Sequence, residues 1–372
     1  MIWLQRLLAG FGVLYVLQAL YSEDASRGLQ NVCFFFIPFS LVFALLIDLR
    51  WDRRLLVYCG AVVAAEALIF GAIGFGQYAM RDLFWNDEVM LANDFHVYFR
   101  VNSLFWDPNI FGRYLALATV IAVTVMLWTR RVPTALALSG GAIVLLVAMA
   151  TTFSQSSYAA LLAGLAALAA LRWSLRWTTA VCVVGIAGAA IAALAAGSID
   201  LSTSNRVNKD TGGRANLISG GLELFADRPV WGYGSGSFSE AFEEQITDGP
   251  ALVSESHTEP VTVAAEQGAL GLVAYAALVG VALWVLASGL GTMMPGIRGS
   301  PQSAGPPAIA AAAILAAMIA LLVHTVTYAG FFEDPITWVL LAAGSVLAAD
   351  RAGDDQATER ASTDGSAVPA EA

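Results

Sequence analysis

The sequence predicts an all-α protein built as a polytopic bundle of transmembrane helices. Of its 372 residues, 58% are hydrophobic and 13% are charged, which is about half the charge of an ordinary soluble domain. The mean hydropathy is +0.68. Apolar runs long enough to cross a bilayer recur along the chain, and arginines gather in alternate connections between them.

About ten segments are candidate spans. We place them at 2–20, 29–47, 55–76, 109–128, 133–151, 156–171, 177–197, 262–287, 308–328 and 335–349. The predicted membrane domain is therefore 1–350. A Gly/Pro/Ser-rich linker at 291–307 separates the eighth and ninth spans. Residues 351–372 lack aromatic residues and predict a disordered cytoplasmic tail.

The placement of arginine orients these spans. Basic residues occupy the connections after spans two, four, six and eight, at Arg50, Arg53, Arg54, Arg130, Arg131, Arg172, Arg176 and Arg298. The opposite short loops hold Arg27 or no basic residue. Because basic loops stay in the cytoplasm, we expect a protein of the cytoplasmic membrane with both termini inside and the loops 77–108 and 198–261 outside.

The outer side carries most of the unusual polar residues. The histidines His96, His257 and His324 lie there, with the basic residues Arg81, Arg100, Arg206, Lys209, Arg214 and Arg228, and Arg113 lies one turn inside the fourth span. Acidic residues outnumber basic ones on this side, which argues against nucleic acid as a partner. An anionic ligand would need a few arginines held together in a drier site.

The long loop 198–261 contains the elements of such a site. Apolar residues recur at helical spacing over 213–226 and 238–246, which predicts two short amphipathic helices on the membrane surface. Between them lie Gly232, Gly234 and Gly236. No strand precedes these glycines and the loop is expected outside, where ATP and NAD are absent, so a nucleotide-binding loop is excluded. A tight turn is the simplest interpretation.

Three blocks of sequence carry a more specific pattern. They are FRVNSLFWDPNIFGRYLALA (99–118), GGRANLISGGLELFADRPVWGYGSGSF (212–238) and SHTEPVTVAAEQGALGLVAY (256–275). With the large loop between spans seven and eight, they resemble the O-antigen ligase and polymerase family. The positions that match its motifs are Arg100, Pro108, Asn109, Arg214, the turn 229–238, His257, Glu266, Gly268 and Gly271.

The resemblance implies transfer of a glycan from an undecaprenyl-diphosphate carrier to an acceptor hydroxyl, by a ligase or a polymerase, without a metal or other cofactor. The implied partners are this donor, a glycan, lipid or protein acceptor, and the membrane. Arg214 is expected to bind the diphosphate, since guanidinium is permanently charged and bidentate. His257 is expected to be the general base. Gly232, Gly234 and Gly236 would pack beneath the Arg214 helix and approach the carrier.

The sequence also departs from the family pattern. Gln155 stands where ligases commonly have an arginine, so Arg100, Arg113 or Arg206 is a candidate to replace that charge. Thr258 follows His257 where the family has asparagine.

Two polar residues near the predicted site have open roles. Glu259 either orients His257 or is a solvated loop carboxylate, and we favour the second. His324 is either part of the substrate site or a polar residue packed at the end of its span.

The alternative function is a transporter or flippase for lipid-linked sugars. Such a protein predicts paired broken helices and ionisable groups near the middle of the membrane. Only Glu66 lies deep in a span, and no inverted repeat is evident.

Overall fold

The structure, a computed structural model, describes residues 2–95, 98–195, 214–246, 256–291, 297–298 and 304–349. All regular elements among them are helices, which confirms the all-α class. In chain order these are α1 (Ile2–Ala19), α2 (Ala25–Asn31), the π-helical η1 (Val32–Phe36), α3 (Ile37–Ile47), α4 (Arg53–Met80), α5 (Asp87–Phe95), α6 (Pro108–Trp128), α7 (Val132–Ala150), α8 (Gln155–Arg172), α9 (Leu175–Ala195), α11 (Arg214–Asp227), α12 (Phe238–Ile246), α13 (Glu259–Gly291), α15 (Pro306–Thr327) and a last helix, Pro335–Ala349. His96, Arg206, Lys209, the loop parts 198–213 and 247–255, most of the linker 291–307 and the predicted tail 351–372 lie outside the described residues.

The predicted spans coincide with helices. Seven helices in the described part are long and apolar enough to cross a membrane, and α2, η1 and α3 together form one of them. The other three predicted spans are α8, the short apolar stretch Leu175–Gly185 of α9, and Pro335–Ala349. The chain is therefore a multi-pass membrane protein, and a count of ten spans stays a prediction.

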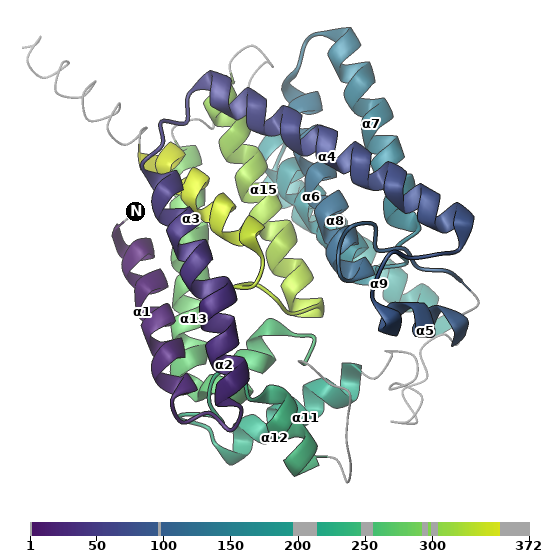
Figure 1. Cartoon of the computed structure of the whole chain (residues 1–372). Coiled ribbons are helices and arrows are strands. Elements are labelled where there is room, and N and C mark those ends of the chain that lie inside the picture. Colours follow the sequence, from purple (N-terminus) through teal and green to yellow (C-terminus); the bar gives the residue numbers. More distant parts are fainter. Residues whose placement is uncertain are drawn as a thin grey trace, which may run out of the picture.

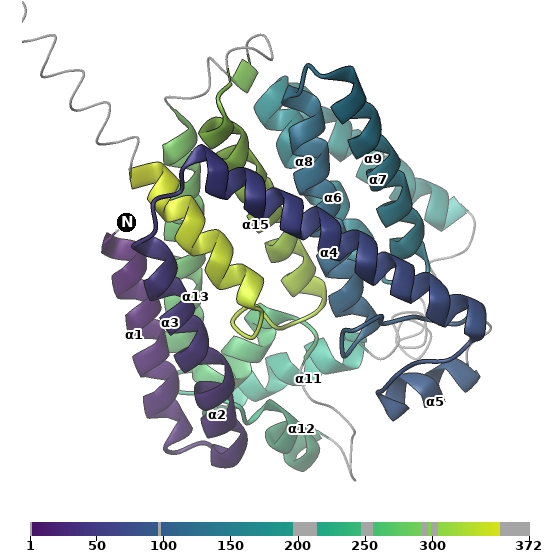
Figure 2. The same cartoon turned by 45° about the horizontal axis from the view of Figure 1, so that its top comes forward.

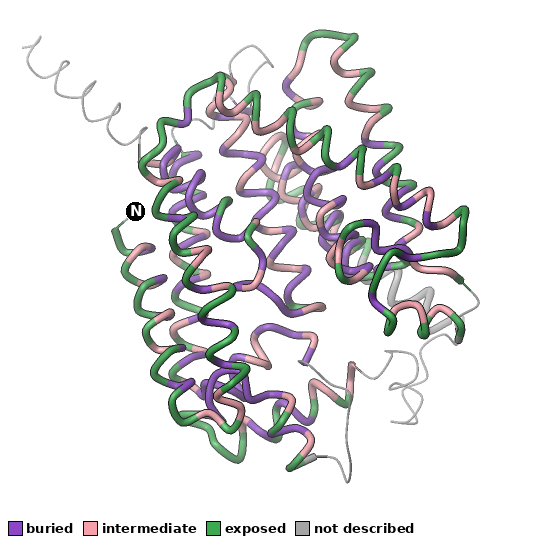
Figure 3. The backbone as a smooth tube through the Cα atoms, in the orientation of Figure 1, coloured by how far each residue is buried: buried purple, intermediate pink, exposed green. Residues whose placement is uncertain are grey.

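Helices α6 and α15 form the centre of the bundle (Figures 1 and 2). Helix α8 packs against both of them. Gly164 of α8 permits this close approach, because a Cβ there would lie 2.6 Å from a Val120 methyl and 3.2 Å from the Cβ of Ala320. Small residues at helix contacts are the usual means of tight packing in membranes. Buried residues accordingly line this central region, while α4 crosses the outside obliquely with few buried residues (Figure 3).

The arginine-bearing connections lie at one end of the bundle. Trp51 packs against Val346 and Leu347 of the last helix, and the first half of α15 borders this cluster. The indole of Trp128 donates to the carbonyl of Ile297 at 3.2 Å, and Arg172 Nη1 donates to the carbonyl of Arg298 at 3.1 Å. The loops that were predicted to share the cytoplasmic side thus share one end.

Helix α13 is broken near its start. Gly268 has φ 64 and ψ −162, a conformation outside the helical region. The glycine turn 229–238 fills the break: Ala269 N donates to the Pro229 carbonyl at 2.8 Å, and Gly234 N donates to the Glu266 carbonyl at 2.7 Å. The break places a short first half of α13 next to α11.

Candidate active site

The candidate site lies at the end of the bundle opposite the arginine-bearing connections. Segments that are distant in sequence meet there: the loop 99–107, the start of α11, residues 256–258 before α13, and the loop 328–334 after α15. Each contributes at least one charged or aromatic side chain.

Arg214 and Arg100 lie close together. Arg214 begins α11 and is half-buried. Burial lowers the pKa of Arg214, and the neighbouring Arg100 guanidinium lowers it further, while Asp107 and Tyr328 oppose the shift. Within the described residues neither arginine forms an ion pair. Two like charges held this close in a partly dry site favour an anionic ligand.

The side chain of Arg100 is held in place by two hydrogen bonds. Its Nε donates to the carbonyl of Thr152 at 2.9 Å, and its Nη2 donates to Asn109 Oδ1 at 3.1 Å. These bonds use two of the five N–H donors of a guanidinium. The Thr152 carbonyl belongs to the turn just before α8, where the family arginine is replaced by Gln155. Arg100 thus brings a charge to the turn that lacks one.

Gln155 itself is exposed in the first turn of α8. It forms no hydrogen bond with the described part of the chain, whereas Ser154 caps the helix by accepting from Ser157 N at 3.3 Å. Within the described residues no hydrogen bond links the Gln155 side chain to Arg214 or His257, and its place in a substrate site stays a prediction.

His257 lies beside Arg214 in a left-handed backbone conformation, with φ 58. A local turn holds it there, since Ser256 Oγ accepts from Thr258 N at 3.1 Å and donates to the Thr258 carbonyl at 2.8 Å. Burial lowers the pKa of His257 from its ordinary value of 6.5, and the Arg214 charge lowers it further; Asp107 acts in the opposite direction. The ring is therefore mainly neutral at pH 7 and can accept a proton.

Tyr328 lies close to both His257 and His324. Its ring centroid lies 5.5 Å from that of His257 and 5.7 Å from that of His324. His324 is fully buried, and neither ring nitrogen makes a hydrogen bond of good geometry within the described residues, although the Asn109 backbone is near. Sequence reasoning missed Tyr328, because a single tyrosine after a span carries no motif.

Asp107 was also missed. It caps α6 by accepting from Asn109 N at 2.6 Å, and its charge acts on both Arg214 and His257. The sequence signal was present, since Asp107 directly precedes the matched Pro108 and Asn109, but an Asp-Pro pair usually indicates only a helix start.

Arg113 is placed differently from Arg100. It is 4% exposed, and its Nε lies 3.0 Å from Oδ2 of the equally buried Asp334. Asp334 also accepts from Ile336 N at 2.8 Å, at the start of the last helix. The charge of Arg113 is thus compensated inside the protein, and the pair ties α6 to the loop that carries Tyr328.

The three glycines of the turn are explained by packing. All have positive φ: 67 at Gly232, 101 at Gly234 and 83 at Gly236. A Cβ would meet the Glu266 carbonyl at the first, the backbone of Ser22 at the second and the Gly28 amide at the third. Backbone atoms of the protein therefore occupy the space that a side chain at each glycine would need. Contact of these glycines with a substrate stays a prediction.

The interpretation of Glu259 as a solvated carboxylate is wrong. Glu259 is 8% exposed, and its Oε2 accepts from Gly330 N at 2.8 Å and Phe331 N at 3.1 Å. Glu259 thus anchors the loop that follows Tyr328. The residues around Glu259 in the sequence do not predict this contact, because its partners are distant in the chain.

Glu266 anchors the glycine turn in the same way. It accepts from Gly236 N at 2.9 Å and from Phe238 N at 3.2 Å, where α12 begins. No group of three or more His, Cys, Asp or Glu side chains within the described residues is arranged to hold a metal ion.

Residues 140–276 match the family model of the O-antigen ligases. This region includes α8, α11, α12, His257 and the break in α13. No curated protein matches the chain. The family match confirms the resemblance that the motifs at 212–238 and 256–275 predicted, and it supports a ligase or polymerase of polysaccharide biosynthesis. The block 99–118, with Arg100, lies outside the matched residues.

Proposed function

We propose, on the premise of this match to the O-antigen ligase and polymerase family, that the chain transfers a glycan from an undecaprenyl-diphosphate carrier to an acceptor hydroxyl outside the cytoplasm. The observation that carries the proposal is the meeting of Arg214, Arg100 and His257. Two guanidinium groups suit a diphosphate, and a neutral imidazole beside them suits a hydroxyl.

In the proposed reaction, the acceptor oxygen forms a bond to the anomeric carbon of the donor glycan. The bond from that carbon to the diphosphate oxygen breaks, and the electron pair leaves with the diphosphate. Arg214 and Arg100 stabilise the charge that develops there. His257 takes the proton of the acceptor hydroxyl, so the products are the lengthened acceptor, the lipid diphosphate and a protonated imidazole.

We propose different tasks for the two outer arginines near α6, Arg100 and Arg113. Arg100 forms no ion pair within the described residues and its charge acts on Arg214, while Arg113 is paired with Asp334. We therefore propose Arg100 as the replacement for the family arginine at Gln155. Since the guanidinium groups supply the positive charge, turnover is expected to persist when a chelator is added.

The test uses the full chain in proteoliposomes with a polyprenyl-diphosphate-linked glycan and a glycan acceptor. A new glycosidic product is expected. Movement of the donor between leaflets without a product would instead indicate a transporter. The broken helix α13 would then be explained as one of the discontinuous helices that are typical of transporters.

Arg214→Lys keeps the charge but loses the planar fork, so turnover should fall about tenfold or more, equivalent to about 1.4 kcal/mol. Arg54→Lys is the matched control, because Arg54 is exposed at the start of α4, at the end of the bundle opposite the site, and should leave turnover unchanged. Full activity of Arg214→Lys would remove Arg214 from the diphosphate site.

A further inference from the structure

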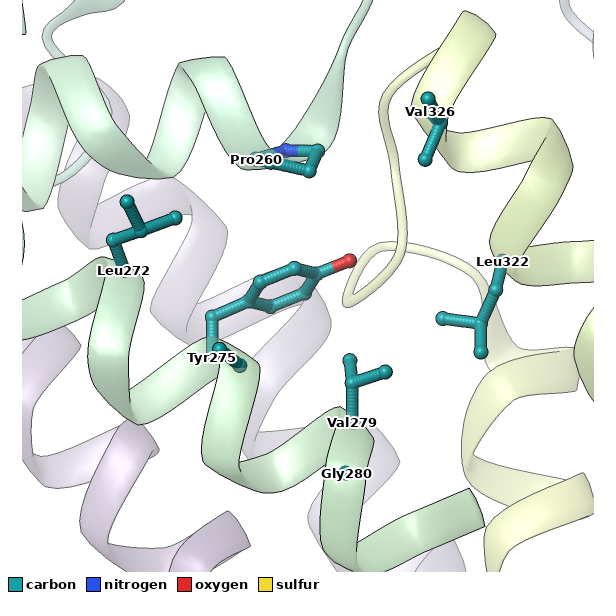
Figure 4. Close-up of a pocket in the computed structure, with 8 residues that line it drawn as sticks. Pro260, Leu272, Tyr275, Val279, Gly280, Leu322 and Val326 are labelled. Atoms are coloured by element: carbon teal, nitrogen blue, oxygen red, sulfur yellow. The ribbon is translucent and has the colours of Figure 1, made fainter.

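An open groove of about 420 Å³ lies between α13 and α15. Figure 4 shows Pro260 above it, Leu272, Tyr275 and Val279 on one wall, and Leu322 and Val326 on the other. Its volume falls within the range of about 300–1,000 Å³ that is common for small-molecule sites. The function proposed above does not by itself assign an occupant to this groove.

The break at Gly268 shapes the groove. Residues 259–267 form the first half of α13 and cross above the groove, while the second half descends along it, so the wall residues and Pro260 face a common space (Figure 4). An unbroken helix would leave no such corner. The kink is fixed by the glycine turn, since a Cβ at Gly268 would meet the Val230 carbonyl.

The lining is apolar. Tyr275 carries the one polar side chain among the lining residues, and its hydroxyl lies within hydrogen-bonding reach of Thr325. A ligand with many hydrogen-bonding groups would lose its hydrogen bonds to water here without gaining protein partners. A flexible hydrocarbon chain has no such bonds to lose.

The groove is continuous with the candidate active site. Pro260 lies three residues after His257, and Val326 lies two residues before Tyr328. A diphosphate bound at Arg214 would therefore place the start of its lipid chain at the mouth of the groove. Both walls belong to helices of membrane-spanning length and composition.

We infer that this groove binds the diphosphate-proximal part of a polyprenyl chain, with the diphosphate at Arg214 and Arg100. The inference rests on the proposed function for the identity of the head group. It adds a defined place for the lipid, a wall that can be altered without touching the charged residues, and a structural role for the Gly268 break.

The experiment measures binding of undecaprenyl diphosphate, without a glycan, to the purified full chain. Gly280 lies at the groove, is exposed, and has no atom within 4 Å of an added Cβ, so Gly280→Leu adds a side chain at the groove without a clash at its Cβ. Gly140 in α7 is also exposed with open space, and Gly140→Leu is the matched control. Excluding two methylene groups corresponds to about a tenfold weaker binding.

We expect Gly280→Leu to weaken binding about tenfold or more and Gly140→Leu to leave it unchanged, with equal melting temperatures. A second measurement needs no substitution: a diazirine-bearing polyprenyl diphosphate should crosslink to the walls formed by α13 and α15. Equal binding by both variants, crosslinks elsewhere, or equal displacement by phosphatidylglycerol would overturn the inference.

The two proposals fail in different ways. Binding and crosslinking in the groove with no glycosidic product would support the groove and refute the transferase. A glycosidic product together with crosslinks outside the groove would refute the groove and leave the transferase standing.

Discussion

His257 has the position, the protonation state and the neighbours that a general base requires. Its ring lies next to Arg214 and against Tyr328, and burial with the nearby positive charge keeps it neutral. In the proposed reaction, a base beside the bound diphosphate would meet the acceptor hydroxyl close to the anomeric carbon that it attacks. The left-handed backbone at this residue places it in the tight turn before α13.

His257→Ala should lower turnover by roughly 10²–10⁴, the usual size of a general-base contribution. Binding of the lipid diphosphate should change much less, because the arginines supply the charge there. His324→Ala is the comparison: His324 also contacts Tyr328 but is fully buried, so measurable turnover should persist. Loss of donor binding in His257→Ala would show that the residue acts on the diphosphate instead.

The pH dependence of turnover follows from the lowered pKa of His257. The neutral form accepts the proton, so activity is present above this pKa and falls as the pH drops through it, below the ordinary 6.5. Asp107 raises the pKa, so Asp107→Asn should move the acid limb to lower pH; asparagine also caps helices well. Asp94→Asn, exposed on α5, serves as the control. An unmoved limb in Asp107→Asn would mean that another group titrates.

At the scale of residues, sequence motifs indicated Arg214, Arg100 and His257, and the structure brings these three side chains together. Their roles in the reaction stay proposals. Glu259 was misjudged, since its partners Gly330 and Phe331 lie some 70 residues along the chain. Tyr328 was missed for the same reason: contacts across the fold leave no local pattern.

At the scale of elements, the amphipathic helices 213–226 and 238–246 were predicted well. They appear as α11 and α12 with nearly the same bounds, because hydrophobic periodicity is a local property. The break in α13 was not predicted. It depends on hydrogen bonds from Ala269 and Gly234 to partners across the turn, and a lone glycine within an apolar run does not reveal them.

Gly268→Ala should destabilise the protein and reduce turnover. A non-glycine residue in this backbone region costs about 1–3 kcal/mol, and the added Cβ also meets the Val230 carbonyl. The readout is the melting temperature of the purified protein in detergent. Gly141→Ala in α7 is the matched change, since that glycine has open space, and it should be neutral or slightly stabilising. Equal melting temperatures for the two variants would show that the break is not strained.

At the scale of the whole molecule, the arginine-bearing connections and the candidate active site lie at opposite ends of the bundle. Trp51, Trp128 and Arg172 tie the arginine-bearing connections together at one end. The loops with Arg100, His257 and Tyr328 meet at the other. Arginine placement predicted this separation from sequence alone, because basic loops are retained on one side of a membrane. The number of crossings is harder to predict, since α8 and the short helix Pro335–Ala349 are held by packing against their neighbours as much as by their length.

The separation of the two ends leads to a test of orientation. The site end should face outward, so Glu240→Cys, exposed on α12, should react with a membrane-impermeant thiol reagent in intact cells. Arg131→Cys, exposed at the opposite end just before α7, should react only after permeabilisation. Both are made in a background where Cys33, Cys59 and Cys182, which lie on helices within predicted spans, are replaced by alanine. The opposite labelling pattern would place Arg100, Arg214 and His257 in the cytoplasm. A donor presented on the outer surface could not reach them there, so the proposed transfer reaction would have to be abandoned together with the topology.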